Sequence, residues 1–138
     1  MKRIILSIFI FLSMASSHAD GLKWSETKQI STAFMGLVAE EKYSEAYKSL
    51  VPYWFIPEHE VNALIYQTEQ QMPQIRARFG KSLSYELVRS EDVGESIIKD
   101  IYIQKFENHA LVWMIIYYKA KDSWKVNSVI FNDQILIL

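Results

Sequence analysis

The hydrophobic residues of this 138-residue chain change their spacing near its middle, and this change limits the possible folds more than any other feature. Before Gly80 they recur every three or four residues, which is the period of an amphipathic helix. From Lys81 onward they alternate with polar residues, which is the period of a half-buried strand. Because the helical segments come first and the strands follow, the sequence predicts an α+β domain.

Three helices are expected before the change of period. In residues 24–41 a single apolar stripe comprises Ile30, Ala33, Phe34, Leu37 and Val38. Ser25 and Ser44 are expected to cap the N-termini of this helix and of a short second helix. Pro57 suits the first position of a third helix, and Pro73 is expected to kink or split that helix.

The second half of the chain predicts an antiparallel meander of four or more strands. The expected segments are a strand around 83–87 that ends before a turn at 91–95, followed by strands at 97–106, 111–119 and 124–131. Both faces of segment 111–119 are apolar, whereas the helices can cover only one face of the sheet. A second subunit would cover the other face, so the sequence predicts a homodimer. The alternative cover is the apolar tail, residues 135–138, folded back over that face.

The first residues of the chain have the pattern of an export signal. Two basic residues precede the apolar run 4–14, which is too short to span a bilayer, since a spanning helix needs about 20 residues. Ala19 ends a small-residue cleavage pattern. The sequence therefore predicts a signal peptide over residues 1–19, one domain over residues 20–138, and a periplasmic or secreted protein free of the membrane after cleavage. The alternative is an uncleaved anchor.

Composition argues against several kinds of chemistry. The chain has 15 Lys and Arg against 16 Asp and Glu with no basic stripe, so we expect no nucleic-acid partner. It has no cysteine and only three histidines, and neither a glycine-rich phosphate loop nor a nucleophile elbow is present. We therefore expect no metal and no cofactor. Asp100, which shares its strand parity with Ile98 and Tyr102, is a weak candidate for a general base.

Aromatic residues are the more informative set for binding. Tyrosine and tryptophan combine apolar area with one polar group, which suits a pocket for an apolar or aromatic ligand. The candidate ligand-binding residues are Tyr47, Trp54, Phe55, Tyr66, Tyr85, Trp113 and Tyr117. The alternative is that they fill the core of a domain that has no disulfide.

Two short segments and the order of the elements carry a family resemblance. They are the helix-to-helix step EKYSEAY at residues 41–47 and the final hairpin that ends in Trp-Lys-Val at residues 124–126. Over nearly all of residues 24–132 the chain resembles the NTF2-like superfamily. The resemblance implies a cone in which three N-terminal helices pack on a curved antiparallel meander sheet, around a conical pocket. It also implies a convex face that commonly dimerises.

The resemblance leaves the function open, because this superfold hosts isomerases, dehydratases, ligand carriers and interaction modules. The sequence favours an exported binding or interaction module for a small apolar or aromatic ligand or for a protein partner. One alternative is an isomerase or lyase that uses one buried carboxylate in the cone. The other is a purely structural protein of an envelope assembly.

Overall fold

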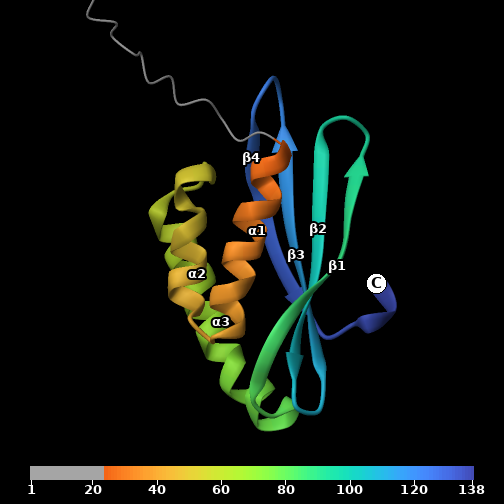
Figure 1. Ribbon diagram of the computed structural model, residues 1–138. Helices are drawn as coiled ribbons and strands as arrows, with labels where there is room; N and C mark the ends of the chain where they lie inside the picture. The colour runs from red at the N-terminus through yellow and green to blue at the C-terminus, as the bar shows by residue number, and fades with distance from the viewer. Residues whose placement is uncertain (1–23) are drawn as a thin grey trace, which may run out of the picture.

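The computed structural model describes residues 24–138, apart from the side chain of Ile137, and its three helices precede its four strands (Figure 1). The elements are α1 (Trp24–Ala39), α2 (Tyr43–Leu50), η1 (Val51–Tyr53), α3 (Glu58–Phe79), β1 (Ser82–Val93), β2 (Ile97–Phe106), β3 (Ala110–Lys119), β4 (Trp124–Asn132) and η2 (Ile135–Ile137). The strands lie in the order β1-β2-β3-β4, and each neighbouring pair is antiparallel. The predicted α+β meander is confirmed, whereas the predicted signal peptide lies outside the described residues.

The helices cover one face of the sheet, which curves around them (Figure 1). Register shifts interrupt the β1–β2 ladder at two places and the β3–β4 ladder between Ile116 and Tyr117. Such bulges increase local twist and bend the strands. Within the described part of the chain, none of the helices is long and apolar enough to cross a membrane.

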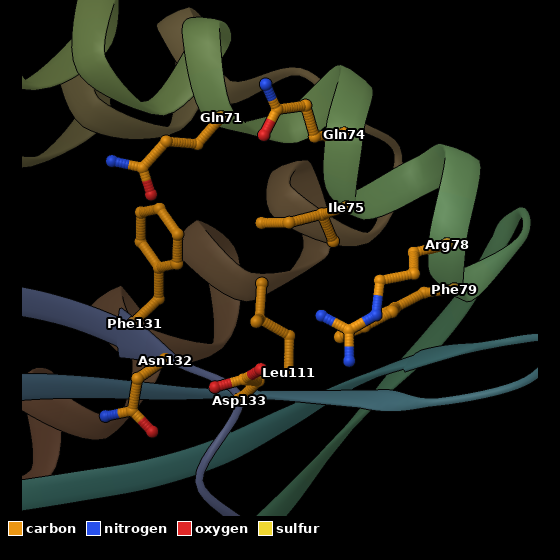
Figure 2. Close-up of a pocket in the computed structure, with 9 residues that line it drawn as sticks. All are labelled: Gln71, Gln74, Ile75, Arg78, Phe79, Leu111, Phe131, Asn132 and Asp133. Carbon is orange, nitrogen blue, oxygen red and sulfur yellow. The ribbon is translucent and has the colours of Figure 1, made fainter.

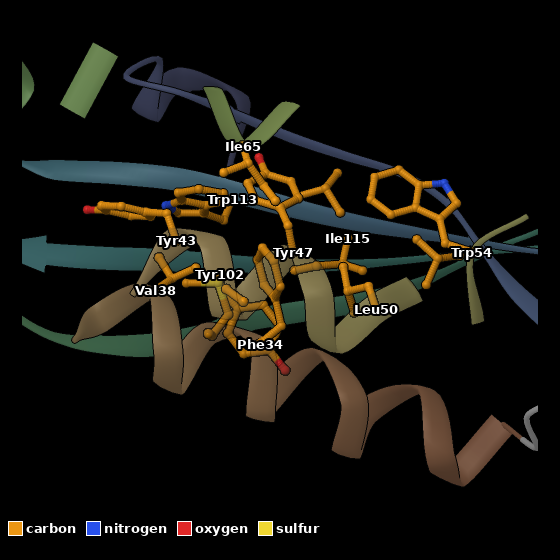
Figure 3. Close-up of a cluster of buried hydrophobic side chains, with 14 of the residues drawn as sticks. Phe34, Val38, Tyr43, Tyr47, Leu50, Trp54, Ile65, Tyr102, Trp113 and Ile115 are labelled. Atoms are coloured by element: carbon orange, nitrogen blue, oxygen red, sulfur yellow. The ribbon is translucent and has the colours of Figure 1, made fainter. Parts of the chain in front are cut away.

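Aromatic side chains fill the space between helices and sheet (Figure 3). The ring of Phe34 on α1 meets the rings of Tyr47 and Trp113 edge to face, with both pairs of ring centroids 5.7 Å apart. Trp113 is 0% exposed. Edge-to-face pairs of this kind add to the hydrophobic gain of burying large rings. The core therefore joins α1, α2 and β3 in one layer.

Four local predictions are wrong. Ser25 lies inside α1, and Lys42 rather than Ser44 precedes α2, because Lys42 continues directly from the last turn of α1. Pro57 is the N-cap residue of α3 rather than its first residue, because the helix begins at Glu58. Helix α3 does not split at Pro73, and a kink there stays a prediction. This residue is on the exposed side of the helix, where water can bond the carbonyl that the proline leaves free. Strand β1 runs on to Val93, because residues 89–93 remain paired with β2.

The outer face of the sheet is partly covered. Since Tyr102 and Trp113 point toward the helices, Ile101 and Val112 point outward, yet both are buried. The segment η2 lies against β3 on the side opposite the helices (Figure 1). Ile130 and Tyr118, which share that outer side, stay exposed. The tail thus covers part of this outer face and leaves the apolar side chains of Ile130 and Tyr118 exposed.

Candidate ligand-binding groove

The space between the helices and the curved sheet is occupied by the protein's own side chains. Three of the predicted ligand-binding residues, Tyr47, Trp113 and Tyr117, are buried there. Their polar atoms already have partners: the Tyr47 hydroxyl accepts from Thr68 Oγ1 at 3.1 Å, and the Tyr117 hydroxyl donates to the Thr27 carbonyl at 2.9 Å. These contacts are those of core residues.

Asp100 lies in a buried polar network that ties α1 to the sheet. It is 1% exposed, and its two carboxylate oxygens accept hydrogen bonds from Ser31 Oγ at 2.7 Å and from Ser90 Oγ at 2.5 Å. The Ser31 hydroxyl is also 2.7 Å from the Tyr117 hydroxyl. Burial, reinforced by the charge of Asp100, raises the pKa of Tyr117 far above its usual value. Because both oxygens of Asp100 are occupied, the geometry favours a structural role for it over general-base catalysis.

Open space lies instead between α3 and β4. One cavity there, the Arg78 cavity, has a volume of about 400 Å³ (Figure 2). Its lining residues are Gln71, Gln74, Ile75, Arg78, Phe79, Leu111, Phe131, Asn132 and Asp133. A second, the Trp54 cavity, has a volume of about 370 Å³. Its lining residues are Trp54, Ile56, Glu60, Ala63, Leu64, Gln67, Asn127, Ser128 and Val129.

The two cavities follow each other along the same two elements. Gln67 lines one and Gln71 lines the next, which is one helical turn along α3. In the same way Val129 and Phe131 are neighbours on one side of β4. We call the two cavities together the α3–β4 groove.

The polar side chains of the groove are largely unused by the protein. No hydrogen bond joins the amides of Gln67, Gln71 or Gln74 to another residue in the range 24–138. The guanidinium of Arg78 lies 5.6 Å from the ring centre of Phe79. No salt bridge among residues 24–138 involves Arg78 or Asp133. The Arg78 cavity therefore combines an apolar floor with a cation, an anion and free amides.

Trp54 stands at the other end of the groove. It is 7% exposed, and its indole N–H is buried without a hydrogen-bond partner among the described residues. Its backbone forms a single parallel bridge with Val126 on β4. Phe55 beside it is 77% exposed, with the Lys125 ammonium 4.4 Å from its ring centre. Phe55 lines a separate hollow with Tyr118 and Lys125, so of the two aromatic residues only Trp54 belongs to the groove.

The remaining predicted residues lie apart from the groove. Tyr66 is 65% exposed on α3 and lines neither cavity. Tyr85 lines a separate, open hollow against α1, together with Thr32 and Gly36. The predicted set is therefore divided among core, groove and other surfaces, and its role in binding stays a prediction.

The hydrophobic spacing of the sequence does not predict the Arg78 cavity. A signal for it exists on α3, where uncharged polar residues and one arginine recur as Gln67, Gln71, Gln74 and Arg78. This spacing places them on one side of a helix, where a solvated helix more often carries mixed charges.

Metal binding finds no support within residues 24–138, which contain no group of three or more His, Cys, Asp or Glu side chains placed to hold an ion. Comparisons with protein-family models, curated proteins and solved structures found no significant match. The geometry of the groove is therefore the basis for inferring a function.

Proposed function

We propose that this protein is an exported, NTF2-like binding module that holds its ligand in the α3–β4 groove rather than inside the cone. The observation that carries the proposal is the Arg78 cavity, whose apolar floor and unused polar groups occur together. A volume of about 400 Å³ falls within the roughly 300–1,000 Å³ of small-molecule sites. The filled interior and the occupied carboxylate of Asp100 support binding over catalysis.

The lining indicates the chemistry of the ligand. Ile75, Leu111 and Phe131 offer an apolar surface, and Arg78 offers the donors that an anionic group prefers. Asp133 opposes a purely anionic ligand, so the favoured ligand has an apolar or aromatic body and only one anionic group. This agrees with the apolar or aromatic ligand predicted from the sequence.

Two fluorescent probes with the same ring system test this proposal. Anilinonaphthalene sulfonate carries an anionic sulfonate, and N-phenyl-1-naphthylamine lacks it. We expect both to bind the wild-type protein. Arg78→Gln is expected to weaken the sulfonate about tenfold, because a hydrogen bond to a charged group contributes about 1.5 kcal/mol, and to leave the neutral probe unchanged.

Matched tryptophan variants locate the probes. Gln74→Trp would fill the Arg78 cavity and is expected to abolish the binding of both probes. Gln70→Trp places the same side chain on α3 outside the cavity and is expected to have no effect. Equal binding by both variants would show that the probes bind elsewhere and would refute the proposed site.

The export proposal rests on the N-terminal pattern and has its own test. N-terminal sequencing of the protein recovered from the cell envelope is expected to begin at Asp20. A protein that retains Met1 and stays with the membrane fraction would contradict both the cleavage and the periplasmic location.

A homodimer through the outer face of the sheet is a second proposal. The exposed apolar side chains of Ile130 and Tyr118 on that face support it. Light scattering of the purified protein is expected to give the mass of two chains, and Ile130→Glu is expected to give the mass of one. A monomeric wild-type protein would mean that the tail is a sufficient cover.

A further inference from the structure

We infer that the α3–β4 groove accepts an extended peptide segment of a partner protein, which pairs with the free edge of β4 as a fifth strand. This inference rests on the proposed function, because it concerns the same groove, and it specifies the class of partner.

Strand β4 is an edge strand. It pairs with β3 on one side, and on the other side the Trp54–Val126 bridge is the only backbone pairing found in residues 24–138. An unpaired edge presents a row of N–H and C=O groups that can bind another chain. Edge addition of an extended peptide is a recurring mode of recognition in which these groups supply affinity.

The bridge at Val126 shows that this edge already accepts a backbone from the groove side. The pairing ends because the chain leaves the edge: Pro57 has no N–H, and α3 begins at Glu58. Beyond the bridge, Asn127, Ser128 and Val129 line the Trp54 cavity. An incoming segment would therefore continue a pairing that the protein itself begins.

The opposite wall carries side chains that suit peptide groups. Gln67, Gln71 and Gln74 line the groove from α3, and their amides have no hydrogen-bond partner among residues 24–138. An amide both donates and accepts, as a peptide group does, whereas a charged side chain offers only one of the two. Gln67 and Gln71 are about 6 Å apart along the helix axis, close to the roughly 6.7 Å between alternate residues of a strand.

The two ends of the groove supply anchors of different kinds. Trp54 lines one end with a large aromatic ring, which suits an apolar side chain of the peptide. At the other end the apolar floor of the Arg78 cavity suits an apolar side chain, and Arg78 suits a carboxylate. From Glu60 to Arg78 the groove spans about 27 Å of helix, which corresponds to about eight extended residues.

A displayed library of random linear peptides, about twelve residues long so that each can span the groove, provides the probe. We expect selection on the purified protein to enrich peptides with apolar residues at alternate positions. Gln71→Trp is expected to abolish their binding, and Gln70→Trp, which lies outside the groove on the same helix, is expected to preserve it. A failure to enrich any peptide, or equal binding by both variants, would overturn the inference.

Backbone methylation of one enriched peptide distinguishes edge pairing from side-chain binding. A strand at an edge uses the N–H groups of alternate residues only. Methylating N–H groups of one parity is therefore expected to weaken binding at least about 30-fold, as expected for two or more lost hydrogen bonds, and methylating the other parity to weaken it less than about threefold. Equal effects of the two parities would refute edge pairing.

Two further outcomes separate this inference from related ideas. If both naphthalene probes bind in the groove but no peptide does, the proposed function stands and the inference fails. If neither probes nor peptides bind there, both fail. Self-association of the protein that Gln71→Trp abolishes would place a second copy in the groove and would likewise overturn the inference.

Discussion

Replacing Gln104 with leucine is expected to destabilise the protein more than any polar substitution on its surface. This side chain lies on β2, is 0% exposed, and joins three parts of the fold. Its amide nitrogen donates to the Val38 carbonyl at 3.1 Å and to Ser82 Oγ at 2.9 Å. Its amide oxygen accepts from Trp113 Nε1 at 3.1 Å.

The magnitude depends on which partners are left unsatisfied. The Val38 carbonyl keeps the bond from the Glu41 N–H, and the Ser82 hydroxyl keeps its bond to the Ala39 carbonyl. Each of these two losses therefore costs about 0.5–1 kcal/mol. The buried Trp113 N–H loses the one acceptor that it has among the described residues, which costs about 1–3 kcal/mol. The free energy of unfolding is expected to fall by about 3 kcal/mol.

Urea denaturation followed by far-ultraviolet circular dichroism measures this change. Gln70→Leu, an exposed site on α3, is the control and is expected to stay within about 0.5 kcal/mol of wild type. In the double variant Gln104→Leu/Trp113→Phe the unsatisfied N–H is gone, so the two changes should cost less together than their sum. A loss below about 1 kcal/mol for Gln104→Leu, or strict additivity, would refute the reasoning.

Three other predictions concern single groups. Burial raises the pKa of Tyr102 to about 12, so the unfolded chain loses this proton at a lower pH than the folded chain does. The free energy of unfolding should therefore fall as the pH rises from about 10 to 12. Tyr102→Phe should flatten this fall, as measured by denaturant midpoints, and an unchanged slope would contradict the prediction. Glu41 has a φ of 60°, so Glu41→Gly should raise the free energy of unfolding by about 0.5 kcal/mol, whereas Glu41→Ala should lower it; equal effects would exclude relief of strain. Asp100→Asn should lower the free energy of unfolding by about 2 kcal/mol, because Ser31 or Ser90 loses a charged acceptor. An unchanged denaturant midpoint for this variant would argue against the structural role of Asp100.

The architecture follows from the change of hydrophobic period because that period decides which residues can share a buried face. Phe34 and Trp113 illustrate this, since each belongs to an apolar stripe of its own segment and the two stripes meet in the core. Local boundaries were less predictable. The extension of β1 depends on cross-strand pairs such as Glu91 and Lys99, whose charged groups are 2.9 Å apart, and no local pattern encodes them.

The groove was beyond sequence reasoning for a different reason. Its existence depends on how far α3 stands from the edge of β4, and hydrophobic spacing does not determine this distance. The sequence predicts Trp113 and Tyr117 as ligand-binding residues, yet both are core residues with satisfied polar atoms. The unpartnered amide row that includes Gln71 is visible in the sequence only when the partner surface of α3 is known.

The connectivity of the sheet has a consequence for the order of folding. Each strand pairs with its neighbour in sequence, so the meander can form from successive hairpins with little loop-closure entropy. The ties between layers close much longer loops: Ser31 and Asp100 are 69 residues apart, and Thr27 and Tyr117 are 90 apart. Docking of α1 onto the sheet is therefore expected to follow hairpin formation. Substitutions in these ties should accelerate unfolding while leaving the folding rate nearly unchanged.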